Sequence, residues 1–159
     1  MDSLSHLKHL YRFNDWANRI IVESVSTAGS DKARGYLAHV LITEQEYFNR
    51  LYGKDSTGFD FWPELSIEEC EELAMHNAGR YGRLLAGLDE NGLEQTARYK
   101  TSKGQSFQNT FREVFTHVLF HSMNHRGQIL TILRTEGHTP PEVDYIVFER
   151  IGLESPDPD

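Results

Sequence analysis

Residues 108–141 read QNTFREVFTHVLFHSMNHRGQILTILRTEGHTPP and predict one long helix from about Gln108 to Glu136. A glycine followed by two prolines, Gly137 to Pro141, is a strong signal for the end of a helix. Positions alternately three and four residues apart trace the inward-facing seam of a helical bundle. They are Phe111, Val114, Val118, His121, His125, Gln128 and Ile132. Two histidines therefore stand where the pattern calls for apolar side chains.

Three more amphipathic helices are expected before this one. Apolar residues at helical spacing over residues 4–25 predict the first, which Gly29 ends. Ser30 is a suitable cap for the second, which continues to Gly53. Ser66 and Glu69 have the spacing of a capping box and open the third, which extends to about residue 88.

Four amphipathic helices without convincing long strands favour an all-α fold, a four-helix bundle. Tyr99 to Phe107 is expected to form a short hairpin before the last helix. The connection at residues 54–65 carries three aromatic residues and is expected to pack back on the body or on a partner subunit. We assign residues 1–152 to one bundle domain and residues 153–159 to a disordered acidic tail.

Composition and charge narrow the classes of partner. The 159 residues carry a net charge of −8, which disfavours binding to nucleic acid or to anionic lipid surfaces. No apolar stretch approaches the roughly 20 residues that span a bilayer. The single cysteine, Cys70, and the absence of a signal-peptide pattern indicate a reducing, cytoplasmic location.

The histidines of the last helix are the strongest candidates for chemistry. His121 and His125 are four residues apart, so their imidazoles project from adjacent turns and can bind one divalent ion. His117 forms a competing pair with His121, but it lies on the flank of the seam. His39, near the middle of the second helix, is the best candidate for a third ligand. A structural role for these histidines, without metal, remains open at this point.

Several segments resemble the DinB-like (YfiT-like) family of metal-binding bundles. The segment His117-Val-Leu-Phe-His-Ser-Met-Asn-His-Arg-Gly-Gln128 resembles the signature of that family's last helix. Tyr11-Arg-Phe-Asn-Asp-Trp-Ala-Asn18 resembles its opening helix, and Leu37-Ala-His-Val-Leu-Ile-Thr-Glu44 the segment that supplies the remaining ligand. The motif Phe59-Asp-Phe-Trp-Pro63 also fits, so the similarity covers nearly the whole chain.

The resemblance implies an up-down-down-up bundle, commonly dimeric, with His39, His121 and His125 as the metal ligands. It also implies an enzymatic activity, because characterised members of the family include metal-dependent thiol transferases. A second apolar row on the last helix agrees with a homodimer: Phe115, Leu119, Ile129 and Leu133.

Three neutral histidines leave a fourth position on the ion open to water or substrate. We therefore expect a metal-dependent transferase that joins a low-molecular-weight thiol to a small electrophile, or else a hydrolase. Zinc is the first choice of metal, although imidazoles also suit nickel, iron and copper. Asn124 and Gln128 are candidates for substrate binding. The alternatives are a non-catalytic metal-binding protein of the stress response and a plain dimeric bundle without metal.

Overall fold

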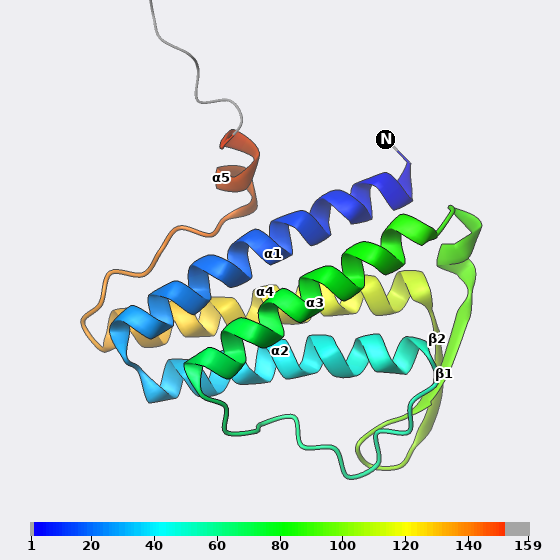
Figure 1. Ribbon diagram of the computed structural model, residues 1–159, viewed down its shortest axis with the longest axis horizontal. Coiled ribbons are helices and arrows are strands. Elements are labelled where there is room, and N and C mark those ends of the chain that lie inside the picture. The colour runs from blue at the N-terminus through cyan, green and yellow to red at the C-terminus, as the bar shows by residue number, and fades with distance from the viewer. Residues whose placement is uncertain (1, 152–159) are drawn as a thin grey trace, which may run out of the picture.

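The computed structural model describes residues 2–151, most of which lie in four long helices. These are α1 (Ser3–Ala28), α2 (Asp31–Leu51), α3 (Ile67–Gly87) and α4 (Phe111–Thr135). Helices α1 and α4 run in one direction and α2 and α3 in the other, so the order is up-down-down-up (Figure 1). The expected all-α four-helix bundle is confirmed. The expected tail at 153–159 lies outside the described residues, so the division of the chain into domain and tail stays a prediction.

Local capping explains where the helices begin and end. Ser30 Oγ accepts a hydrogen bond from the backbone N–H of Ala33 at the start of α2. Ser66 and Glu69 form the predicted capping box at the start of α3. Gly29 ends α1 at a φ of 62°, a left-handed conformation that glycine adopts without strain.

The predicted hairpin is present and longer than expected. Strands β1 (Thr96–Lys100) and β2 (Ser106–Thr110) pair antiparallel, and a short 3₁₀ helix, η1 (Asn91–Glu94), precedes them. Because β2 occupies residues up to Thr110, α4 begins at Phe111 rather than near Gln108. Thr110 then caps the helix through a second capping box with Glu113.

The core consists of two apolar clusters separated by a belt of buried polar residues. One cluster includes Ile21, Leu37 and Ile129, and the other includes Tyr11, Tyr81 and Phe115. Between them each long helix contributes polar side chains that are less than 5% exposed. They are Asn14 and Asn18 of α1, Glu44 of α2, Asn77 of α3, and Ser122 and Arg126 of α4.

The second apolar row of α4 is part of this core and does not form an outer face. Phe115 and Ile129 are fully buried, Leu133 is 1% exposed, and Leu119 packs against one of the clusters. The row therefore gives no support to a homodimer. The exposed apolar side chains of α4 are instead Phe120 and Met123.

A short fifth helix, α5 (Tyr145–Arg150), was not expected from the sequence. It packs on α1, where the Phe148 ring lies 5.8 Å from Phe13 and 5.5 Å from Trp16 between centroids. Its six residues include none that is fully buried, so no helical periodicity signals it.

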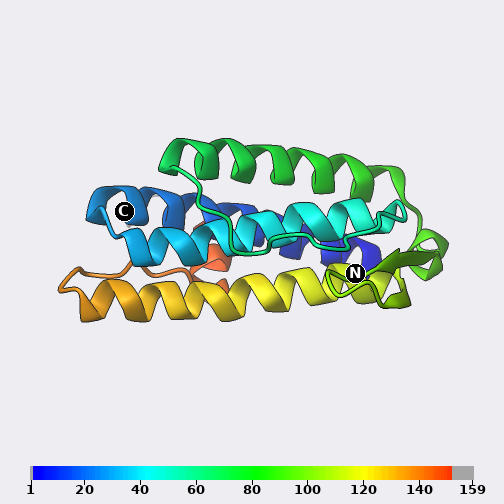
Figure 2. The same ribbon diagram turned by 90° about the horizontal axis from the view of Figure 1, so that it is seen from below.

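The connection between α2 and α3 runs back along the bundle beside α2 (Figure 2). Backbone hydrogen bonds from Ser56 N to Lys100 O and from Gly58 N to Ser102 O fasten it to the hairpin. The prediction that this aromatic connection packs on the body is confirmed, and its contact with α2 involves one of the candidate ligands. No helix within residues 2–151 is long and apolar enough to cross a membrane.

Candidate metal centre

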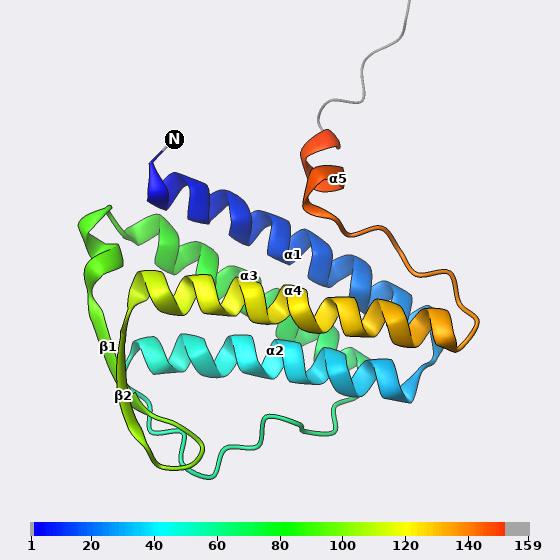
Figure 3. The same ribbon diagram turned by 180° about the vertical axis from the view of Figure 1, so that it is seen from behind.

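His39, His121 and His125 converge where α2 and α4 lie side by side (Figure 3). His39 Nε2 is 3.2 Å from the Nε2 atoms of both His121 and His125. One nitrogen from each ring lies within 4.8 Å of the others. His39 is 7% exposed, whereas His121 and His125 are partly exposed. The cluster therefore lies at the edge of the core, with one side accessible to solvent.

Two of the three imidazoles are fixed through the nitrogen that faces away from the cluster. His39 Nδ1 is 2.6 Å from the backbone carbonyl oxygen of Phe61, which can only accept a hydrogen bond. His125 Nδ1 is 2.5 Å from Gln128 Oε1. In the neutral rings these Nδ1 atoms carry the proton, so both Nε2 lone pairs point at the centre of the cluster.

Trp62 covers one side of the cluster. Its ring stacks on His39 with centroids 3.8 Å apart and an interplanar angle of 1°. It also meets His125 edge-on at 6.1 Å. The tryptophan, still 52% exposed, forms a wall between His39 and solvent. This role depends on the path of the loop at 52–66, and the helical periodicity of the flanking segments does not predict it.

Burial favours the neutral form of His39 and His121. It lowers the pKa of His39, although the hydrogen bond to Phe61 opposes the shift. For His121, burial and then repulsion by His125 and His39 lower the pKa to about 3. Neutral imidazoles are the form that coordinates a metal ion. The site can therefore accept an ion at neutral pH without first losing protons from these two rings.

The spacing of the nitrogens fits a divalent ion. Zinc binds histidine nitrogens at about 2.0–2.1 Å, so two nitrogens of one tetrahedral site are roughly 3.3 Å apart. The two 3.2 Å separations agree with this value. The Nε2 lone pairs of His39 and His125 point at one centre and would repel each other there without a cation or a shared proton. The geometry thus favours a bound cation over simple packing.

The other candidates of α4 lie beside the cluster. His117 is outside it, with its ring 5.7 Å from His121 and 4.6 Å from Tyr47. Asn124 and Gln128 are both exposed and line a shallow surface hollow with Tyr36. Gln128 was expected on the inward seam and in fact lies at the surface, where it holds His125. The role of Asn124 as a substrate contact stays a prediction.

A buried polar network behind the site was not anticipated. Glu44 Oε1 accepts hydrogen bonds from Asn14 Nδ2 at 2.8 Å, Asn18 Nδ2 at 3.0 Å and Ser122 Oγ at 2.8 Å. Arg126 Nη1 donates to the side-chain oxygens of the same two asparagines. The sequence signal that could have predicted this network is the pair Asn14 and Asn18, which lie four residues apart among apolar neighbours. Such pairs on a buried face need partners.

Neither buried acid of α2 belongs to the three-histidine cluster. Glu44 is engaged in the polar network, and Glu46 Oε2 forms a salt bridge with Lys54 at 2.9 Å. Cys70 is buried, and burial raises the pKa of its thiol to about 11. The thiol therefore remains protonated and unreactive at neutral pH.

Comparison with known proteins agrees with the resemblance seen in the sequence. The model of the DinB family matches residues 3–155. Protein DinB of Bacillus subtilis (strain 168) is 23% identical over 158 residues, which cover 87% of this chain and 91% of that protein. No solved structure matches the chain.

Proposed function

Because the chain belongs to the DinB family, we propose that it is a metal-dependent enzyme that transfers a small electrophilic group to a low-molecular-weight thiol. The observation that carries the proposal is the convergence of His39, His121 and His125 at a partly exposed edge of the core. Three protein ligands are typical of catalytic sites, since structural zinc sites use four. These residues are the proposed ligands of one divalent ion per chain.

Zinc is the first candidate, because three imidazoles at tetrahedral spacing suit it, and nickel, iron and copper are the alternatives. When bound, such an ion lowers the pKa of a thiol or water that occupies its remaining position. The proposed reaction replaces the S–H bond of the thiol and the carbon–X bond of the electrophile by a carbon–sulfur bond. It releases a proton and the anion X⁻.

Residues around the cluster orient the imidazole rings and determine the side from which substrates can approach. The Phe61 carbonyl and Gln128 hold two rings with Nε2 toward the centre, and Trp62 closes the side next to His39. The substrates then approach from the exposed side of α4. There Asn124, whose side chain is exposed at the rim, is the proposed polar contact for the thiol or the electrophile.

The test is a conjugation assay with the metal-loaded protein. N-acetylcysteine and a chloronitrobenzene serve as probe thiol and electrophile, and the release of chloride and formation of the thioether are measured. We expect turnover that depends on added Zn²⁺ or Ni²⁺ and is lost in His125→Ala. Stoichiometric metal binding without turnover across a panel of thiols and electrophiles would favour the alternative, a non-catalytic metal-binding protein of the stress response. Hydrolysis of the electrophile without thiol would indicate a hydrolase.

A homodimer and a cytoplasmic location are also part of the proposal. Phe120 and Met123, 63% and 53% exposed on α4, are the apolar residues available for a subunit contact. Light scattering should then give about twice the 18.3 kDa mass of one chain, and the monomer mass would argue against the dimer. The single buried cysteine, with no second cysteine to pair with, supports the cytoplasm.

A further inference from the structure

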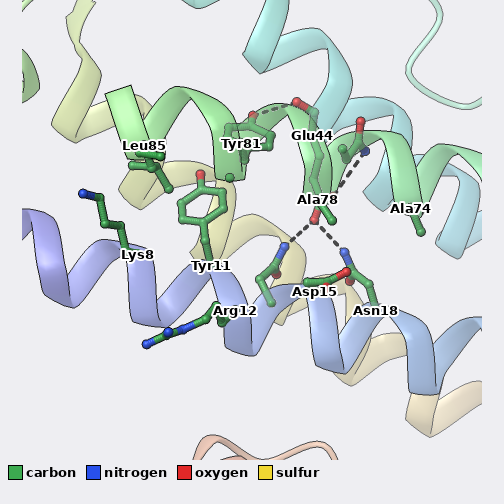
Figure 4. A pocket seen from close by; sticks show the side chains of 14 residues that line it. Lys8, Tyr11, Arg12, Asp15, Asn18, Glu44, Ala74, Ala78, Tyr81 and Leu85 are labelled. Atoms are coloured by element: carbon green, nitrogen blue, oxygen red, sulfur yellow. Dashed lines mark hydrogen bonds between the residues drawn. The ribbon is translucent and has the colours of Figure 1, made fainter. Parts of the chain in front are cut away.

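A cavity of about 390 Å³ opens between α1 and α3, and none of the three clustered histidines lines it. It exists because α3 places only small residues at four-residue intervals opposite α1. These are Ala74, Ala78, Gly82 and Ala86. The rings of Tyr11 and Tyr81 and the side chain of Leu85 form much of its apolar wall (Figure 4).

The floor of the cavity is the carboxylate of Glu44, which reaches between the two helices toward Asn18 of α1 (Figure 4). Glu44 is only 2% exposed. Its Oε1 atom accepts three hydrogen bonds, whereas Oε2 accepts one, from Asn77 Nδ2 at 3.3 Å. A carboxylate oxygen has two lone pairs, so Oε2 retains acceptor capacity.

The other polar groups of the floor also offer acceptors. Asn77 is 2% exposed, and its Oδ1 atom has no hydrogen-bond partner although Nδ2 has two. The phenol protons of Tyr11 and Tyr81 are already donated to the carbonyl oxygens of Phe115 and Glu44. A ligand that enters the cavity therefore meets unused acceptors at its floor, so it must bring donors.

The charge of Glu44 points to a cationic donor. Its carboxylate forms no salt bridge with any of residues 2–151. The guanidinium of Arg126 is linked to Glu44 only indirectly. It donates hydrogen bonds to Asn14 and Asn18, and these asparagines in turn donate to Glu44. A buried carboxylate surrounded only by neutral donors lacks the direct counter-charge that such groups usually have.

We propose that the cavity between α1 and α3 binds a primary alkylammonium ion, with its ammonium group on Glu44 and Asn77. An ammonium group carries three donors, enough for Glu44 Oε2, Asn77 Oδ1 and one tyrosine oxygen. The alkyl body fills the apolar part, which a bare potassium or sodium ion would leave empty. An anion at this floor would be repelled by the carboxylate of Glu44.

Titration of the ¹⁵N-labelled full chain with butylammonium chloride tests the proposal by nuclear magnetic resonance. The side-chain amide signals of Asn14, Asn18 and Asn77 report directly on the floor. We expect saturable shifts of these signals. Butanol, which has the same shape without the charge, should bind at least about tenfold more weakly, a difference of about 1.4 kcal/mol. Potassium chloride and sodium butyrate should leave the signals in place.

Matched glycine variants locate the binding site. A Cβ added at Gly82 or at Gly35 would meet no atom within 4 Å, and both lie within helices, but only Gly82 lines the cavity. Gly82→Leu should weaken butylammonium binding about tenfold or more, and Gly35→Leu should leave it unchanged. Glu44→Gln removes the charge and should abolish the preference for butylammonium over butanol.

Three results would overturn the proposal. Equal shifts with potassium chloride would identify a simple cation site, and equal affinity for butanol would show that charge has no role. Equal binding by Gly82→Leu and the unmodified chain would place the ligand elsewhere. Each readout is independent of metal loading and of turnover, so failure of the proposed enzyme activity would leave this test intact.

Discussion

Ser122 Oγ donates a hydrogen bond of 2.8 Å to the buried carboxylate of Glu44, and this contact sets the rotation of α4 against α2. Ser122 directly follows His121. In the same way Arg126, which directly follows His125, is anchored to Asn14 and Asn18 of α1. His121 and His125 therefore each precede a residue that is fixed in the core. This arrangement places both imidazoles at the edge of the bundle, facing His39.

Loss of the Ser122 hydroxyl should destabilise the fold. Ser122→Ala removes a hydrogen bond to a buried charged group. It should lower the free energy of unfolding by about 1.5 to 3 kcal/mol. Urea denaturation of the metal-free protein measures it. Ser5→Ala, an exposed serine-to-alanine change in α1, is the matched control and should stay within about 0.5 kcal/mol. Equal stability of the two variants would show that the network does not hold α4.

Trp62 should report on metal binding. Its ring is stacked on His39, whereas Trp16, the other tryptophan, packs against Phe148 of α5. Addition of Ni²⁺ should quench fluorescence in the unmodified protein and in Trp16→Phe, because both retain a tryptophan beside the ion. The emission of Trp62→Phe should change little. A similar response in both single-tryptophan variants would mean that the ion binds elsewhere or that quenching is nonspecific.

The metal-free protein should lose stability on acidification through the histidine cluster. Burial holds the pKa of His39 and His121 below the ordinary value, which is about 6.5 in the unfolded chain. Below about pH 6.5 the unfolded chain binds protons that the folded chain does not. The free energy of unfolding should therefore fall from about pH 6.5 toward the folded pKa of His121, about 3.

Urea denaturation with a chelator present, from about pH 7 to pH 4, checks this prediction. His121→Ala removes the most strongly shifted group and should reduce the slope of stability against pH. An unchanged slope in this variant would mean that carboxylates alone cause the acid sensitivity. In the metal-loaded protein the loss of stabilisation by the ion should occur in the same acid range, because protons and metal compete for the rings.

Much of the bundle follows from local sequence signals. The apolar spacing of α1, the capping residues Ser30 and Ser66, and Gly29 all predict elements that the structure contains. The three histidines were also selected from their positions on two helices. Their side chains lie together in the structure because helical periodicity determines which side chains share a face, and two facing helices bring their inner faces together.

Features that depend on contacts between distant segments were not predictable in this way. The seam assigned to α4 included Gln128, but the buried line passes through Ser122, Arg126 and Ile129 instead. The buried face of α4 is therefore rotated by about one residue from the predicted one, because Ser122 and Arg126 point into the core. Their side chains belong to the buried polar belt, whose other members lie on the three other long helices. The stacking of Trp62 on His39 likewise depends on the path of a long connection, for which local sequence gives no period.

Metal content of untagged protein tests the central claim most directly. After dialysis against Zn²⁺ and then buffer, elemental analysis should find about one ion per chain in the unmodified protein and in His117→Ala. His39→Ala, His121→Ala and His125→Ala should retain almost none while remaining folded by circular dichroism. Less than about a tenth of an ion in the unmodified protein, or equal loss in folded His117→Ala, would contradict the assignment of the three ligands.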